Sequence, residues 1–140
     1  MEDFEFEIRG GIKAKLKPRC RSTRLAGFAE KYPGAIDAVS QLVSTTAGPL
    51  KVDERLAGLF IKGLSAKDTT GVIAFLAEQI AGFELPEDAD GEWSALDWKA
   101  LEPEGREESI DLLLSTLDLV SLFIAAWSHY QGMGVRARRA

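Results

Sequence analysis

Few residues in this 140-residue chain have the type and spacing that catalysis requires. Gly58 and Gly63 have the spacing that opens a phosphate-binding loop, but the motif then needs lysine and the next residue is Leu64. The only histidine, His129, excludes a metal site built on paired histidines, and it is far along the chain from the only cysteine, Cys20. We therefore expect no enzyme, no catalytic residue and no cofactor.

An acidic segment offers the other candidate for site chemistry. Asp88, Asp90 and Gly91 would occupy three liganding or turn positions of a calcium-binding loop. The first position of that loop would then be Pro86, which has no side-chain oxygen to bind the ion. We interpret residues 84–92 as a solvated acidic connector and expect no metal site. His129 is better explained as a cation at a helix C-terminus than as a member of a Ser-His-Asp triad.

The composition is typical of one globular domain. Hydrophobic residues make up 46% of the chain and charged residues 28%, with a formal net charge of -5. A single cysteine excludes an internal disulfide, and the acidic start lacks the basic and apolar parts of a signal peptide. We expect a cytoplasmic protein with one domain over residues 1–131 and a flexible basic tail over residues 132–140.

Charge is distributed unevenly along the chain. Residues 9–24 include seven basic residues and no acidic one, whereas residues 84–108 include ten acidic residues and two basic ones. The candidate basic patch consists of Arg19, Arg21, Arg24, Arg136, Arg138 and Arg139. These cations either neutralise the acidic segment, within the fold or between subunits, or bind an anionic partner. The chain lacks zinc-finger spacing and interleaved aromatic and basic residues, so we do not expect nucleic acid as the partner.

Alternating residues at the N-terminus predict a β-hairpin over residues 1–18. Acidic residues alternate with apolar ones over 3–8, and basic residues alternate with apolar ones over 12–17. A three-residue loop, Arg9-Gly10-Gly11, places apolar residues opposite apolar ones and acidic residues opposite basic ones. A two-residue loop would instead place apolar residues opposite charged ones. The expected cross-strand pairs are Asp3 with Lys17, Phe4 with Leu16, Glu5 with Lys15, Phe6 with Ala14, Glu7 with Lys13 and Ile8 with Ile12.

Helical spacing replaces the alternation beyond residue 22. The pattern predicts a mainly α fold in which the hairpin is followed by a bundle of about five to six helices over residues 22–131. We expect helix starts at Ser22 or Thr23, at Ala35, after Asp53 and after Ser65, whose helix reaches Ile80 and exits at Gly82. A further capping box, Ser94 to Asp97, predicts a short helix over 95–101 on which Trp93 and Trp98 form a hydrophobic staple.

The last predicted helix, residues 107–130, is the longest and most apolar. Its polar residues Asp111, Ser115, Asp118 and His129 fall in one stripe, and the two aspartates argue against a membrane span. A small fold would not cover so wide an apolar circumference, so we expect self-association through this helix. The expected partner-binding surface includes Val120, Phe123, Ile124 and Trp127.

The layout resembles that of the tail assembly chaperones of long-tailed bacteriophages. The similar features are the hairpin sequence Phe4 to Ile12, the segment Ile80 to Leu85, the acidic turn Asp88 to Gly91, the short helix with Trp98, and the closing helix that ends Ala125 to Tyr130. The resemblance implies a non-enzymatic, self-associating protein that binds the helical tape-measure protein and promotes tail-tube assembly. It implies no catalytic residues. The compartment would then be the host cell cytoplasm.

Two other protein classes fit the same composition. One is a phage or mobile-element inhibitor that binds a host protein through its acidic surface, as anti-CRISPR proteins do. The other is a minor structural component of a phage particle. Both share with the chaperone the expectation of a protein partner.

Overall fold

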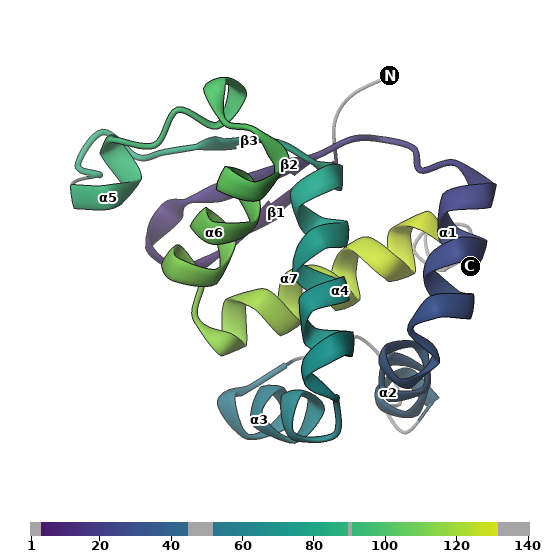
Figure 1. Cartoon of the computed structure of the whole chain (residues 1–140). Coiled ribbons are helices and arrows are strands. Elements are labelled where there is room, and N and C mark those ends of the chain that lie inside the picture. Colours follow the sequence, from purple (N-terminus) through teal and green to yellow (C-terminus); the bar gives the residue numbers. More distant parts are fainter. Residues whose placement is uncertain (1–3, 45–51, 90, 132–140) are drawn as a thin grey trace, which may run out of the picture.

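A computed structural model describes residues 4–44, 52–89 and 91–131 (Figure 1). Within these ranges the chain forms three strands, seven α-helices and two short 3-10 helices. In chain order these are β1 (Phe4–Glu7), η1 (Arg9–Gly11), β2 (Lys13–Leu16), α1 (Ser22–Lys31), α2 (Pro33–Ser44), α3 (Glu54–Lys62), α4 (Ala66–Gln79), β3 (Ile80–Glu84), α5 (Gly91–Ser94), η2 (Trp98–Ala100), α6 (Pro103–Leu113) and α7 (Thr116–Tyr130). The prediction of a mainly helical fold with an N-terminal hairpin is confirmed. The predicted tail, residues 132–140, lies outside the described residues.

The hairpin has the predicted register. Phe4 pairs with Leu16, Glu5 with Lys15, Phe6 with Ala14 and Glu7 with Lys13. The connection is the three-residue segment 9–11, in which both glycines have a positive φ that other residues rarely adopt. The Ile8 N–H donates to the Ile12 carbonyl at 2.8 Å, which closes the loop. The predicted partner of Lys17, Asp3, lies outside the described residues.

A third strand, β3, was not predicted. It pairs antiparallel with β2, which therefore becomes the central strand of the sheet. Helix α4 ends at Gln79, and the next five residues extend along β2 with an irregularity between Lys15 and Leu16. The expectation that the helix continues through Ile80 to Gly82 is wrong. The segment Ile-Ala-Gly-Phe-Glu has no period-two pattern, so alternation did not predict the strand.

The helix starts follow the predicted capping residues at two positions. The Asp53 carboxylate accepts from the Leu56 N–H at 2.8 Å, and Ser65 forms a full capping box with Asp68. Helix α1 differs, since Ser22 is its first helical residue and the preceding Arg21 provides no side-chain cap. The first turn of α1 therefore has no side-chain acceptor at its N-terminus.

The predicted single helix over 107–130 is two helices. Helix α6 ends at Leu113, Leu114 and Ser115 are extended, and α7 begins at Thr116 (Figure 1). The Ser115 hydroxyl accepts from the Asp118 N–H at 3.1 Å, so Ser115 caps α7 and is not part of a polar stripe. The break lets α6 pack on α4 while α7 packs on α3.

The two tryptophans near residue 95 do not staple a helix. Helix α5 ends at Ser94, and Trp98 lies in the 3-10 helix η2, so the predicted helix over 95–101 is absent. Both indoles instead contact Phe83 of β3 edge-on, each with ring centroids 5.2 Å apart. The Trp98 N–H donates to the Ile80 carbonyl at 3.0 Å. These contacts hold the 93–100 segment against the sheet.

Helix α7 lies at the centre of the fold, as its composition predicts, but its apolar face is covered. Val120, Phe123, Ile124 and Trp127 are each at most 5% exposed. The prediction that these four residues form an exposed partner-binding surface is therefore wrong. Helices α3 and α4 pack on α7, and the aromatic rings of Phe28, Phe60 and Phe75 surround Phe123. No described helix has both the length and the hydropathy needed to cross a bilayer.

Replacing Ser115 by Ala is expected to lower the free energy of unfolding by about 0.5–2 kcal/mol, because the first turn of α7 loses its cap. The control is Ser40→Ala, which removes the hydroxyl of an exposed serine within α2 and should leave stability within about 0.5 kcal/mol of the parent. Urea denaturation followed by circular dichroism measures both. Equal stabilities for the two variants would show that residues 113–116 do not form a capped break.

Candidate functional site

An apolar hollow of the described surface lies between α2 and α3. Helix α2 packs mainly on α1 and α4, and α3 packs mainly on α7, so the two helices leave a groove of about 470 Å³ between them. Its lining residues are Gly34, Asp37, Ala38, Gln41, Leu42, Leu59, Phe60 and Gly63. We call this hollow the α2–α3 groove.

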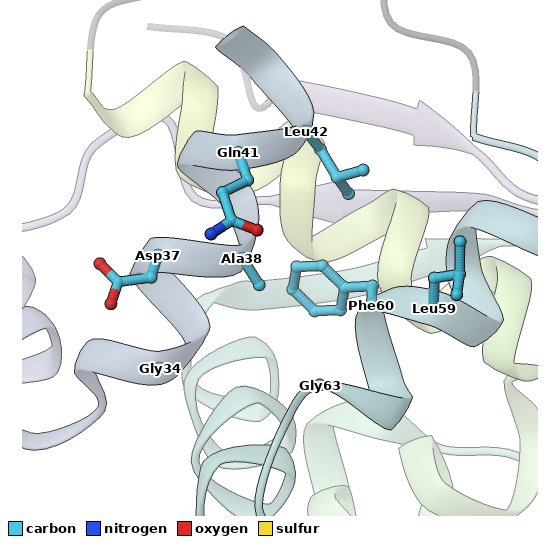
Figure 2. Close-up of a pocket in the computed structure, with 8 residues that line it drawn as sticks. All are labelled: Gly34, Asp37, Ala38, Gln41, Leu42, Leu59, Phe60 and Gly63. Carbon is cyan, nitrogen blue, oxygen red and sulfur yellow. The ribbon is translucent and has the colours of Figure 1, made fainter. Parts of the chain in front are cut away.

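The floor of the α2–α3 groove is apolar and anchored in the core. Figure 2 shows the Phe60 ring pointing from α3 toward Ala38 of α2. Phe60 is 3% exposed, and its ring also contacts Phe123 of α7 at a centroid distance of 6.3 Å. Because α7 holds the floor from behind, the groove is built on rigid helices rather than on loops.

The rim of the groove has one apolar and one polar side. Leu59 is 54% exposed and is one of two exposed large apolar side chains among the described residues. Asp37 and Gln41 follow each other by one helical turn along α2, and Figure 2 shows the Asp37 carboxylate pointing away from Phe60. The arrangement offers apolar contact at the floor with a carboxylate and an amide beside it.

Sequence reasoning missed this groove. A signal was present, because α3 has apolar residues at 56, 57, 59, 60 and 61, more than one buried helix face accommodates. The structure turns Ala57 and Phe60 inward and leaves Leu59 outward. A second hollow, of about 240 Å³, contains the other exposed large apolar residue, Leu112, which is 71% exposed.

The predicted basic residues are only partly brought together. A different concave site, of about 490 Å³, lies where β2 leads into α1 beside the end of α4. We call it the basic cleft. Its lining residues are Lys17, Arg19, Cys20, Arg21, Thr23, Arg24, Glu78 and Gln79. It therefore contains three of the six predicted patch arginines, whereas Arg136, Arg138 and Arg139 lie outside the described residues.

One patch arginine already has a partner inside the fold. Arg24 donates from Nε to the Glu78 carboxylate at 2.8 Å, and its guanidinium lies 5.4 Å from the centre of the Phe75 ring. Lys15 lies 3.9 Å from Glu84, which joins one residue of the basic N-terminal segment to one of the acidic segment. Both pairs are solvent-exposed, so each contributes little to stability.

Cys20 is a neutral thiol in the basic cleft. Burial raises its pKa, and nearby Glu78 raises it further, although Arg24 and Lys17 act in the opposite direction. Nucleophilic cysteines have a lowered pKa. Cys20 thus lacks the electrostatic activation that such chemistry needs.

His129 has a structural role at the end of α7. Its ring stacks on Phe4 of β1 with centroids 4.3 Å apart, and its Nε2 lies 3.3 Å from the Pro18 carbonyl. The neighbouring Tyr130 hydroxyl donates to the Lys17 carbonyl at 2.6 Å. These contacts tie the segment that leads into α1 to the C-terminal end of α7.

Within residues 4–44, 52–89 and 91–131, no three His, Cys, Asp or Glu side chains lie close enough together to hold a metal ion. The calcium-loop position Asp90 lies outside these ranges. Comparison with protein-family models, with curated proteins and with solved structures found no match to this chain.

Proposed function

We propose that the protein is a non-enzymatic binding protein that holds an amphipathic helix of a partner protein in the α2–α3 groove. In its sharpest form the proposal is a phage tail assembly chaperone, acting in the host cytoplasm, whose partner is the helical tape-measure protein. The main support for this proposal is the groove itself, which is lined by the exposed Leu59 and by the buried Phe60.

The shape and polarity of the groove support a helical partner. Grooves between helices accept amphipathic helices through apolar anchors one turn apart. Here Ala38, Leu42 and Leu59 offer apolar contact along the groove, and Asp37 at the rim would attract a lysine or arginine on the polar face of the incoming helix. Long helical proteins with repeating apolar positions, such as tape-measure proteins, present that combination.

The α2–α3 groove replaces the surface expected from sequence. Because Phe123 and Trp127 are buried, exposing them to a partner would require α7 to leave the core. Leu59 is exposed and needs no such rearrangement. The proposal therefore retains the class of partner and changes the residues that bind it.

Replacing Leu59 by Lys is expected to weaken partner binding by about tenfold or more, which corresponds to about 1.4 kcal/mol of binding free energy. The change places a charge where the apolar face of the partner helix would lie. The measurement is titration calorimetry with synthetic helical peptides from the tape-measure protein encoded in the same genome. Affinity should change little between low and physiological salt, since the contact is mainly apolar.

The matched control is Leu112→Lys, which removes the other exposed large apolar side chain of the described residues with the same charge change. It should bind the peptides as the parent does. Absence of binding by the parent protein would reject the tape-measure partner. Equal weakening by both variants would show that the α2–α3 groove is not the binding site.

A further inference from the structure

The basic cleft concentrates positive charge in a chain that is acidic overall. Four cationic side chains line it against one carboxylate, whereas the whole chain has a formal net charge of -5. Arg24 and Glu78 pair with each other. Among the described residues, the ion pairs leave Lys17, Arg19 and Arg21 without a carboxylate partner. Three cations at one concave site repel each other unless an anion joins them.

The backbone adds hydrogen-bond donors to the same site. Helix α1 is ten residues long and begins at Ser22, beside Arg21 and Thr23 of the cleft. Its first turn has no side-chain cap and no acidic residue. The free N–H groups and the positive end of the helix dipole favour an anion at this position.

A buried side chain in the cleft wall points independently to a ligand. Gln79 is 4% exposed, and its Oε1 has no hydrogen-bond partner among the described residues. Its backbone carbonyl accepts from the Lys17 N–H at 2.9 Å, which fixes Gln79 beside the cations. A buried carbonyl oxygen without a partner costs a fold free energy, and a bound group is one of the explanations for such an atom.

We propose that the basic cleft binds the phosphate group of a small phosphorylated molecule. The anionic oxygens would lie between Arg19, Arg21 and the first turn of α1, with Lys17 adding charge. A hydrogen phosphate group has both an O–H donor and oxygen acceptors. Its O–H could donate to the Gln79 Oε1 if the Gln79 side chain turned from its buried position toward the cleft. No bond is made or broken at the site. The neutral Cys20 thiol forms part of the wall.

The test uses the full chain and pyrophosphate as the probe. Pyrophosphate is expected to raise the melting temperature in a saturable manner at constant ionic strength, because a ligand that binds only the folded state stabilises it. Titration calorimetry gives the dissociation constant. Sodium chloride at the same ionic strength should produce no comparable shift in melting temperature. That difference would show that pyrophosphate binds at a site and does not act only by screening charges.

The double variant Arg19→Gln/Arg21→Gln is expected to weaken pyrophosphate binding by about tenfold or more, since hydrogen bonds from charged donors are lost. The matched control, Arg55→Gln/Lys62→Gln, removes the same charge from exposed positions on α3 and should bind as the parent does. The variant Leu59→Lys should also bind pyrophosphate normally. A failure of the phosphate site is thereby distinguished from a failure of the α2–α3 groove.

Gln79→Met separates a ligand-binding role from a structural one. It replaces the unpaired amide by an apolar side chain of similar size, so the ligand-free protein should melt at the same or a higher temperature while pyrophosphate binding weakens. A lower melting temperature with unchanged binding would show that Gln79 acts only in the fold.

Two results would overturn the proposal. One is the lack of any saturable response to pyrophosphate, or an equal response from the parent and the Arg19→Gln/Arg21→Gln variant. The other is tight binding of a short single-stranded oligonucleotide, with a steep salt dependence, by a protein that does not respond to pyrophosphate. That outcome would assign the cleft to a nucleic-acid backbone.

Discussion

Replacing Phe123 by Ala is expected to lower the free energy of unfolding by about 3–5 kcal/mol. Phe123 is 0% exposed, and its ring is surrounded by the rings of Phe28, Phe60, Phe75 and Trp127, with centroids 5.6–6.3 Å away. Removing the ring leaves a cavity among side chains from α1, α3, α4 and α7. Because those helices hold each other, the surroundings cannot collapse to fill it. Urea denaturation followed by circular dichroism provides the measurement.

The control is Leu112→Ala, in which a large apolar side chain that is 71% exposed is shortened. Its stability should stay within about 0.5 kcal/mol of the parent. The pair also decides between two descriptions of α7. If α7 presented Phe123 to a partner, Phe123→Ala would be tolerated by the isolated chain, and such tolerance would contradict the buried position.

Replacing Gly71 by Ala is expected to destabilise the fold by about 1–3 kcal/mol, although alanine is the better helix former. An added Cβ at Gly71 would lie 2.5–2.6 Å from three carbons of the Tyr32 ring. That ring also contacts Phe28 at a centroid distance of 5.0 Å, so it has a core neighbour on another side. Thermal and urea unfolding both report the loss.

The matched control for this prediction is Gly58→Ala in α3. Nothing lies within 4 Å of the added Cβ there, so only the helix preference changes and stability should rise by about 0.5–1 kcal/mol. The two substitutions are chemically identical and have opposite expected signs. A gain at both positions would mean that Tyr32, just after α1, does not approach α4 as closely as the Tyr32–Gly71 contact requires.

The buried α7 face changes the argument for self-association. That expectation rested on an apolar circumference too wide for a small fold to cover, but α3, α4 and the aromatic rings of the core cover it. Self-association remains a proposal, but the four buried residues of α7 cannot form its interface. A mass measurement by light scattering tests it, and a monomer mass at high micromolar concentration would reject it.

Features that depend on near neighbours in the chain could be predicted from the order of the residues. The hairpin register follows from alternation and from a glycine loop, and the caps at Asp53 and Ser65 follow from side chains that reach backbone groups three residues away. The Ser115 cap has the same local form, Ser115 to Asp118, but the continuous apolar pattern around it favoured an unbroken helix.

Features that join distant segments depend on the packing of the whole chain and could not be predicted locally. Strand β3 exists because residues 80–84 find a partner in β2 more than sixty residues earlier, which no local period reveals. Burial of Trp127 and exposure of Leu59 depend on which helices cover α7 and α3. The α2–α3 groove and the basic cleft likewise depend on how segments distant in the sequence pack beside each other. Periodicity shows that a residue lies on an apolar face, but the packing of the whole chain decides whether that face is covered.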